Sequence, residues 1–573
     1  MDFVPTIKTC DRLKWHGAFA AALGMVTLSA GASAALAAPP PPPSAGSVLQ
    51  QATPPATVLT PPKPVLILPP SSAAQPLSST TMLTVSQLVV DGNHLLPTAM
   101  LDKLLAPAKG RTMSLAALQT YADLITQAYH THGYPIAYAY LPPQSIRDGV
   151  VRIAVVEPKY DQVQITGQSR LRESVVRHTV LAQPGMTVTS ATLDRSLLLL
   201  NQTPGLQVEG SLIPGAQPQT TTLQIERHDQ PLFVANVSEN NDGNRYTGTY
   251  LTNATVTAND PFGYGSALAV NGISSQSGGL KAAGFTLLSP NIWNGLRAGA
   301  YGSAVFYGLG GKFAGLQQVG RETQLGADLT YPLVLQPDRQ FNVRFDTISD
   351  SLAQTTHSTQ DLSRQMIVIE QMSLDGAVQD GWGGITTASL ALSHGQLKIS
   401  PAAAKAIDAS GPKAEGDFLV SQMRLGHTQS LPEGFMLSLN ANGQISDKNL
   451  DSSQQIFLGG PYGVMSYPVG SGGGDEGYVL SASLDHPLPV PSLPGQLSAL
   501  ALAQNGAVWT NHTPYPGFTG QNRISESGVG VGLTYKCRRF SIDTDYVLPV
   551  GKTNVAGGDN AGNQFWFQLG SAF

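Results

Sequence analysis

The sequence predicts a transmembrane antiparallel β-barrel of 16 strands, preceded by two small α/β domains. Three observations carry this prediction. From residue 231 onward the helical period disappears, and segments of strand character follow one another to the end of the chain. Their connections alternate between short turns and mostly longer loops, as in outer-membrane barrels. Charged residues make up only 12% of the 573 residues, against about 25% in a typical soluble protein.

The N-terminal region predicts export. Residues 1–38 have the basic start, apolar run and small-residue cleavage candidates (32–34 and 35–37) of a secretory signal peptide. No later run of 18 apolar residues follows, so we expect no transmembrane helix after it. Residues 39–80 are a proline-rich linker, in which 45–51 fits either a short helix or more of the linker.

Two consecutive α/β units follow the linker, at 81–157 and 158–228, and both have the order strand, helix, helix, strand, strand. In the first unit Ser114 is placed to cap a helix over 115–132. Its strands are expected at 83–90, 136–141 and 150–156. In the second unit the helices are expected at 170–181 and 189–201, and the closing strands at 206–212 and 221–225.

The barrel is expected over residues 231–573. Its sixteen strands are predicted at 231–240, 246–258, 265–275, 279–289, 295–306, 321–334, 340–350, 365–378, 384–398, 417–427, 434–446, 477–486, 498–509, 525–537, 539–549 and 563–573. The last strand places Phe565, Phe567 and Leu569 on the same face as the terminal Phe573, which is the known assembly signal of outer-membrane barrels. A soluble β-sandwich is the alternative, and it fits the scarcity of charge less well.

Several kinds of chemistry are excluded. A net charge of −5 argues against nucleic-acid binding. Two cysteines cannot supply a disulfide scaffold or a cysteine-rich metal site. Gly551-Lys552-Thr553 lacks the upstream glycine of a phosphate loop, because that position is Tyr546, so no nucleotide site is expected. The sequence predicts no cofactor, no metal and no catalytic centre.

One block of sequence is specific enough to indicate a family. Residues 457–470, continuing to Tyr478, closely resemble the loop between strands 11 and 12 of the two-partner secretion transporters (TpsB type), the ShlB/FhaC/HecB family. Gly133-Tyr134-Pro135 and Leu193-Asp194-Arg195 are similar to motifs of that family's two POTRA domains. Asn241-Asp242-Gly243-Asn244 is similar to its first barrel hairpin.

The resemblance implies two periplasmic POTRA domains, a barrel in the bacterial outer membrane, and loop 447–476 folded into the lumen. It also implies a plug helix, for which 45–51 is the candidate. The implied site residues of the loop are Gly459, Gly460, Val464, Met465, Ser466 and Tyr467. Their expected partners on the barrel wall are Leu502, Gln504 and Gly506.

This chain departs from the family at one pair of positions. The family loop carries an arginine where Met465 stands, and its wall carries an aspartate where Gln504 stands. Both charges are replaced together, so neither leaves an unpaired charge in the lumen. We expect a neutral contact between Met465 and Gln504.

The resemblance implies export of one large TpsA-type exoprotein, such as an adhesin, haemolysin or haemagglutinin, without a nucleotide. An unfolded exoprotein can add as an extra strand to a POTRA sheet. The expected edge residues are Ile136, Tyr138, Tyr140, Leu206, Val208 and Leu212. Outer-membrane lipid and the barrel assembly machinery are the other expected partners. The alternatives are a barrel assembly or insertion factor of the same superfamily, a passive porin, or a barrel enzyme.

Overall fold

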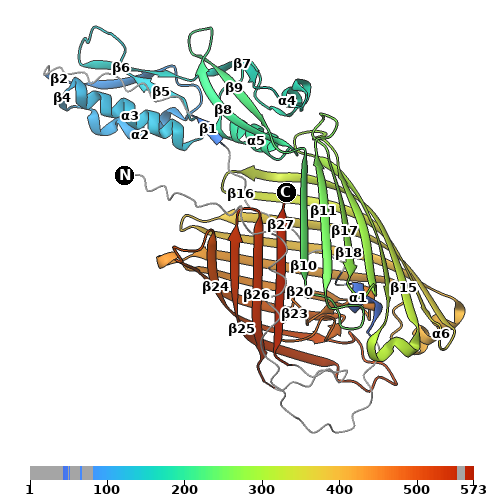
Figure 1. Ribbon diagram of the computed structural model, residues 1–573. Helices are drawn as coiled ribbons and strands as arrows, with labels where there is room; N and C mark the ends of the chain where they lie inside the picture. The colour runs from blue at the N-terminus through green and yellow to red at the C-terminus, as the bar shows by residue number, and fades with distance from the viewer. Residues whose placement is uncertain (1–42, 50, 52–64, 68–81, 552–561) are drawn as a thin grey trace.

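The computed structural model describes residues 43–49, 51, 65–67, 82–551 and 562–573. The predicted signal peptide and most of the predicted linker lie outside these residues. Two α/β units stand at one end of a large barrel, and the chain enters the barrel from the second unit (Figure 1). Among the described residues, no helix has the length and apolar character needed to cross a membrane.

The barrel is closed by 16 antiparallel strands, which confirms the predicted fold class. The first strand, β10, pairs with both β11 and the last strand, β27, and so closes the sheet. The strands are β10 (Phe233–Asn240), β11 (Leu251–Asn259), β12 (Ala267–Ser275), β13 (Leu280–Leu288), β14 (Arg297–Gly308), β15 (Gln318–Gln336), β16 (Arg339–Thr356), β17 (Asp361–Gln379), β18 (Gly384–Ser400), β19 (Gly416–Ser430), β20 (Met436–Ser446), β23 (Glu476–Leu488), β24 (Gln496–Trp509), β25 (Arg523–Cys537), β26 (Phe540–Pro549) and β27 (Gln564–Ala572).

Side chains alternate between the lumen and the outer wall along each strand. On β17, Met366 and Val368 are exposed on the outside, whereas Ile367 and Ile369 are buried on the inside. The wall is uneven in height, because β15 to β18 have 17 to 19 residues and β10 to β13 have 8 or 9. The predicted segments are shorter than these long strands, since their polar outer ends lack an apolar face.

The connections on the outer side carry structure that the sequence did not indicate. The helix α6 (Ala402–Ser410) lies between β18 and β19, and the 3₁₀ helix η4 (Gly311–Leu316) lies between β14 and β15. On the opposite, short-turn side a shorter 3₁₀ turn, η5 (Pro432–Gly434), joins β19 to β20. The helix α6 ends where the Asp408 carboxylate accepts the backbone N–H groups of Ala414 and Glu415.

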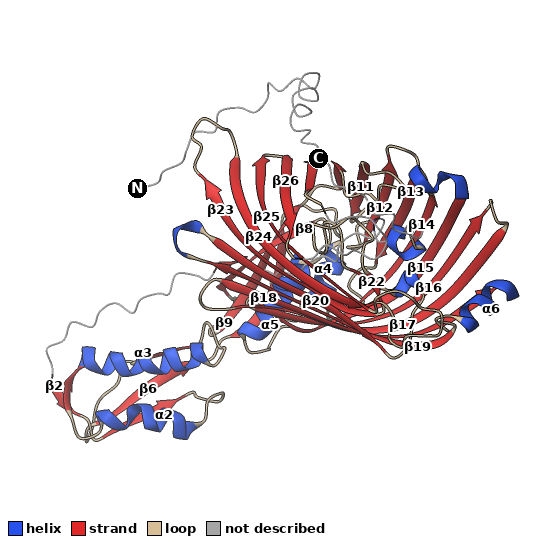
Figure 2. Ribbon diagram, turned by 90° about the horizontal axis from the view of Figure 1, so that it is seen from below, coloured by secondary structure: helices blue, strands red, loops and turns tan. Residues whose placement is uncertain are grey.

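The first α/β unit has a three-stranded sheet in the order β3-β6-β5, covered by α2 and α3 (Figure 2). Ser114 caps α3 as predicted, because its Oγ accepts the N–H of Ala117. The expected strand at 83–90 is two strands, since the chain turns between them at Val85, which is fully buried. The elements are β2 (Met82–Thr84), β3 (Gln87–Asp91), α2 (Thr98–Leu105), η3 (Ala106–Ala108), β4 (Thr112–Ser114), α3 (Leu115–Thr131), β5 (Tyr138–Tyr140) and β6 (Val150–Val156).

The second unit has the order strand, helix, helix, strand, strand, and its sheet is extended by a strand from the linker. Its elements are β7 (Lys159–Thr166), α4 (Glu173–Thr179), α5 (Ser190–Asn201), β8 (Leu206–Pro214) and β9 (Thr220–Asp229). The strand β1 (Val65–Ile67) pairs in parallel with β8, so the sheet order is β1-β8-β9-β7.

The second unit is docked on the short turns of the barrel. The guanidinium of Arg195 donates to Asn294 Oδ1 at 2.8 Å and to the carbonyl of Pro332 at 3.0 Å. Leu198 and Leu199 of α5 are buried against Leu335 of β15. These contacts fix the short-turn end of the barrel as the end that faces the two α/β units.

Candidate functional site

A long loop between β20 and β23 fills part of the barrel lumen. It contains η6 (Ser452–Gln454) and the small hairpin formed by β21 (Ile456–Phe457) and β22 (Gly473–Gly474). Leu458 and Val464 are fully buried and pack with wall residues Val479, Val508 and Ile524. The apolar side chains of this loop therefore form a hydrophobic core together with the inner wall of the barrel.

The structure brings Met465 of the loop and Gln504 of the wall together. The Met465 backbone N–H donates to Gln504 Oε1 at 2.9 Å. The Met465 carbonyl accepts a hydrogen bond from Trp566 Nε1 at 2.7 Å. The Met465 side chain is buried with Leu502 and Val547. Both backbone groups of Met465 are thus bound to the wall, on β24 and on β27, without any charge.

Glycines on the inner face of the wall leave room for the loop. A Cβ on Gly528 would lie 2.3 Å from Ser466 Oγ, and a Cβ on Gly506 would lie 2.9 Å from Leu458 Cδ2. Such distances are below van der Waals contact, so larger residues at either position would displace the loop. Tyr467 is buried beside these residues.

The turn at the start of the motif depends on Gly459 and Gly460. The backbone of Gly460 has φ +105°, a conformation that favours glycine. A Cβ on Gly459 would lie 2.2 Å from the carbonyl oxygen of Pro468. The predicted loop residues Gly459, Gly460, Val464, Met465, Ser466 and Tyr467 thus lie together, and Leu502, Gln504 and Gly506 lie against them.

Asp475 anchors the end of the loop. This fully buried carboxylate accepts hydrogen bonds from the N–H groups of Leu450 (3.2 Å) and His512 (2.9 Å) and from Gln455 Nε2 (2.8 Å). Burial raises the pKa of Asp475 above its usual value, although these donors oppose the shift. Its three bonds join the two ends of the loop to the connection after β24.

The helix α1 (Ala45–Leu49) lies inside the barrel, next to the loop (Figure 1). Val48 and Leu49 are buried against Tyr246 and Phe313 of the outer connections. Toward the loop, the Gly46 N–H donates to Ser452 Oγ at 3.4 Å. Just after the helix, Gln51 Oε1 accepts the Asn244 N–H at 2.8 Å.

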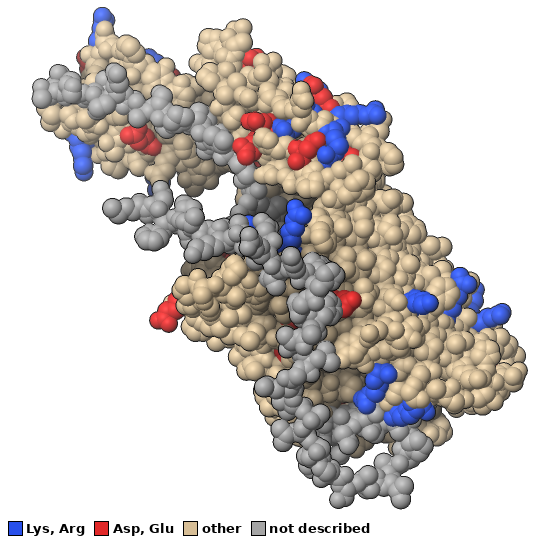
Figure 3. Space-filling view, in the orientation of Figure 1, with Lys and Arg blue, Asp and Glu red and all other residues tan. Residues whose placement is uncertain are grey.

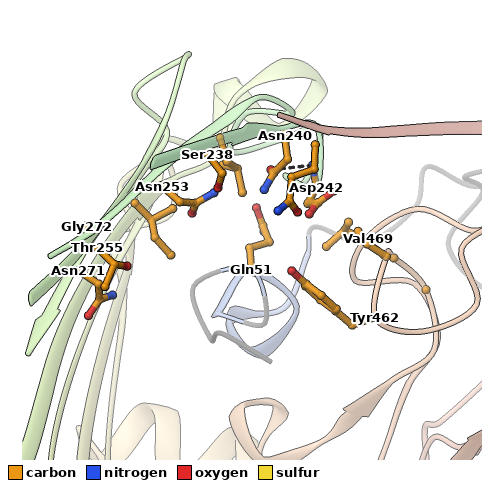
Figure 4. Close-up of a pocket in the computed structure, with 16 residues that line it drawn as sticks. Gln51, Ser238, Asn240, Asp242, Asn253, Thr255, Asn271, Gly272, Tyr462 and Val469 are labelled. Carbon is orange, nitrogen blue, oxygen red and sulfur yellow. Dashed lines mark hydrogen bonds between the residues drawn. The ribbon is translucent and has the colours of Figure 1, made fainter. Parts of the chain in front are cut away.

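A cavity of about 290 Å³ lies between Gln51, the loop and the wall (Figure 4). Gln51, just after α1, points into the cavity, and Tyr462 and Val469 of the loop border it. The wall contributes short polar side chains from β10, β11, β12 and β27: Ser238, Asn240, Asn253, Thr255, Asn271 and Gln568. The lining carries one acidic side chain, that of Asp242.

The predicted strand edges of the α/β units differ from each other. On β5 the side chains of Tyr138 and Tyr140 are exposed, and the Ala139 N–H donates to Thr126 Oγ1 of α3 at 2.9 Å. A neighbouring contact joins His130 Nε2 to the Ala137 carbonyl at 3.0 Å. Side chains of α3 thus form hydrogen bonds with backbone groups along the outer edge of β5.

Ile136 and the β8 residues lie elsewhere. Ile136 precedes β5 and packs against the core of the second unit. Leu206, Val208 and Leu212 are buried in that core, and the outer edge of β8 is paired with β1.

Sequence reasoning missed Trp566, the residue that binds the Met465 carbonyl. Its position on the lumenal face of the last strand, alternating with Phe565 and Phe567, was the available signal. The terminal Phe573 is exposed, and its backbone N–H and carbonyl pair with Ala235 of β10. The sequence also gave no indication of Glu526, a buried wall residue whose Oε1 accepts a hydrogen bond from Ser471 Oγ at 3.2 Å.

A closed barrel with a loop locked inside it and two α/β domains at one mouth defines a POTRA-containing outer-membrane transporter. Comparison with protein families agrees: the POTRA domain of ShlB type matches residues 83–158. The family "Haemolysin secretion/activation protein ShlB/FhaC/HecB" matches residues 219–535, more than half of the chain.

Individual relatives are more distant. The chain is 27% identical to the heme/hemopexin transporter protein HuxB of Haemophilus influenzae (strain 86-028NP) over 494 residues, covering 86% of this chain and 87% of that protein. It is 24% identical to the outer membrane transporter CdiB of Escherichia coli O6:K15:H31 over 180 residues, 31% of this chain and 30% of that one.

Solved structures share the fold. The CdiB structure from Escherichia coli has a TM-score of 0.70 at 18% identity and covers 88% of this chain and 92% of its own. BamA from Haemophilus ducreyi, lacking POTRA domains 1–3, has a TM-score of 0.51 at 14% identity and covers 86% of this chain and 100% of its own.

The chain belongs to the ShlB/FhaC/HecB family. It is an outer-membrane transporter of the two-partner secretion type, acting on a TpsA-type exoprotein, with its POTRA domains in the periplasm.

Proposed function

We propose that the barrel lumen is the exit path of an unfolded exoprotein, and that α1 closes this path at rest. The observation that carries the proposal is the unequal attachment of the two lumenal segments. The loop shares a hydrophobic core with the wall and binds it through both backbone groups of Met465. In contrast, α1 is a single segment of five residues that is buried against the wall and the outer connections mainly through apolar side chains, and its described hydrogen bond to the loop, from Gly46 to Ser452, is long at 3.4 Å. The helix is therefore the segment that leaves, and the loop stays as part of the wall.

The cavity beside α1 supports this path. Once α1 leaves, the cavity joins the space that the helix filled. Beside apolar side chains such as Leu251 and Ile273, the polar groups that the barrel strands contribute to the cavity are mostly neutral amides and hydroxyls. Such groups exchange hydrogen bonds with a passing backbone without binding a particular sequence. A charged lining would retain segments of opposite charge, so this lining suits a substrate of varied sequence.

The exoprotein is first bound at the edge of β5 in the periplasm. An added strand would replace the hydrogen bonds that Thr126 and His130 make to this edge. The exposed Tyr138 and Tyr140 would contact alternate side chains of the added strand. The edge of β8 is a second receptor only after β1 leaves it.

Two further partners act on the barrel itself, the barrel assembly machinery and the lipid of the outer membrane. Phe573 acts during assembly as the signal read by the barrel assembly machinery, and the outer wall contacts outer-membrane lipid. Transport uses no nucleotide and involves no catalytic step by this chain. Folding of the exoprotein outside the cell makes transport directional.

Secretion of a partner encoded by a neighbouring gene tests the receptor assignment. Removing residues 81–157 should abolish secretion, while the barrel still inserts and migrates as a folded species on unheated gels. A finer variant is Thr126→Val, which frees the Ala139 N–H and should raise the affinity of the periplasmic domains for the unfolded partner by up to about fivefold. Thr120→Val, on an exposed part of the same helix, is its control. Undiminished secretion after the deletion would overturn this receptor.

A further inference from the structure

The outer wall of the barrel carries a row of basic side chains at its extracellular end. Lys281 of β13 is directly opposite Phe306 of β14, and Phe306 is opposite Arg321 of β15. The same row continues through Ala353 of β16 to Arg364 of β17. Directly opposite residues on neighbouring strands face the same side of a sheet. Phe306 is exposed and its neighbour Tyr307 is buried in the lumen, so this row faces outward.

The row lies at the edge of the apolar belt. On β15 the exposed Leu325, Leu329 and Leu333 follow Arg321 on the outer face. Leu333 is 12 positions from Arg321 (333 − 321), which is about 40 Å along a tilted strand and matches an apolar band about 25 Å tall. The domain contacts at Asn294 and Pro332 mark the opposite, periplasmic end. The basic row is therefore level with the headgroups of the extracellular leaflet.

These cations have no anionic partner among the described residues. Within the described part of the chain, Lys281, Arg321 and Arg364 form no ion pair and no side-chain hydrogen bond, and the Arg321 guanidinium lies 5.2 Å from the centre of the Phe306 ring. A fourth basic residue, Lys398 of β18, is opposite the outward-facing Met366. Basic side chains gather at the lower right of the barrel in Figure 3, over the outer end of β15 and its neighbours.

Neighbouring strands are about 4.8 Å apart, so alternate strands space Lys281, Arg321 and Arg364 by roughly 10 Å. Spaced cations on a wall suit a ligand with several phosphates held at fixed height by its acyl chains. Arginine and lysine are the side chains that bind phosphate in this setting. We propose that this row, Lys281, Arg321, Arg364 and Lys398, is a docking surface for the phosphate groups of lipopolysaccharide in the outer leaflet.

The test uses the full-length protein in detergent, titrated with lipopolysaccharide and, separately, with the same lipid after its phosphates have been removed. The variant K281Q/R321Q/R364Q removes three charges from the row. The control K103Q/K109Q/R111Q removes three charges from exposed positions of the first periplasmic domain. The readouts are the dissociation constant and the rise in unfolding temperature on lipid binding.

We expect the wild type and the control to bind phosphorylated lipid more tightly than dephosphorylated lipid. Each lost cation should weaken binding about fivefold, so the triple variant should lose on the order of 100-fold. If the triple variant does not fold, R321Q alone should show the single-residue loss and R321K should restore binding. Equal binding of the two lipids by the wild type, or unchanged binding by a folded triple variant, would overturn the proposal.

Discussion

Gln504 of β24 accepts a hydrogen bond from the Met465 backbone N–H at 2.9 Å, at the two positions where the family resemblance places an aspartate and an arginine. The contact is neutral, and it binds the backbone rather than the side chain of residue 465. The Met465 side chain turns instead to Leu502, Val547 and Trp566. At Met465 the loop is thus held to the wall by the Gln504 amide, by the Trp566 indole N–H and by apolar packing.

This contact predicts coupled effects of charge at the two positions. Met465→Arg places a cation in an apolar cluster, and Gln504→Asp places an anion beside it. Either change alone should cost about 2 kcal/mol or more of barrel stability. The double change should recover at least about 1 kcal/mol. Heat denaturation of the four proteins in a double-mutant cycle measures this coupling, and additive losses would show that the residues do not interact.

The hydrogen bond from Trp566 to the Met465 carbonyl predicts that removing the indole N–H lowers barrel stability. Trp566→Phe keeps an aromatic ring in the cluster but leaves the Met465 carbonyl without its donor. A buried carbonyl without a partner costs about 1–3 kcal/mol. Phe565→Leu, on the exposed outer face of the same strand, is the control and should change stability little. Equal unfolding temperatures for Trp566→Phe and the wild type would contradict the role assigned to the indole N–H.

The glycines of the inner wall predict a steric effect that a second change relieves. Gly528→Ala puts a Cβ 2.3 Å from Ser466 Oγ, and the loop must shift. The expected cost is about 1–3 kcal/mol. Ser466→Gly in the same chain should remove most of it. Gly272→Ala is the matched control, because its Cβ would meet no atom closer than 3.8 Å. Protease sensitivity of the loop reports its displacement, and protection equal to the wild type would contradict the tight fit.

Asp242, in the outer turn between β10 and β11, predicts a dependence on pH. Burial, and then the negative charge of Asp545, raise the pKa of Asp242 to about 7. An aspartate in the unfolded chain has a pKa of about 4, so the folded chain binds more protons between about pH 4 and 7. Stability contributed by this group therefore falls as the pH rises through that range, and stays level above it.

The measurement compares unfolding temperatures at pH 5 and pH 8. The wild type should be relatively more stable at pH 5, and Asp242→Asn should reduce that difference. Asp102→Asn, on the exposed face of α2, is the control. A difference between the two pH values that is the same in the wild type and in Asp242→Asn would contradict the assignment.

The barrel could be predicted strand by strand, because alternation between lipid and lumen repeats in every strand. The approach of Met465 to Gln504 could also be predicted, although only through the family resemblance. The partner at Trp566 could not, since no local pattern relates residue 465 to residue 566. That contact depends on closure of the barrel, which brings the last strand beside the loop.

The strand that the linker contributes, β1, could not be predicted from the sequence. Residues 65–67 gave no strand signal between prolines, yet β1 pairs with β8. An exposed sheet edge accepts any extended backbone of suitable length, so the partner segment needs no distinctive side chains. For the same reason the sequence could not indicate which sheet edges were already occupied.

The most direct test of the account is a reversible bond between α1 and the loop. Ser47 is buried against Gly470, where a Cβ would lie 2.7 Å from the Ser47 Cβ, close enough for a disulfide between cysteines at these positions once the two Cβ atoms separate by about 1 Å. Gly470 has φ +81°, a conformation that strains other residues, so G470C alone must still secrete for the test to be read. The measurement is secretion of the partner exoprotein by S47C/G470C under oxidising and reducing conditions, with each single-cysteine variant as control. The account predicts no secretion when the bond is formed and restored secretion when it is reduced. Equal secretion in both conditions, with the bond shown to have formed, would contradict the claim that α1 must leave the barrel.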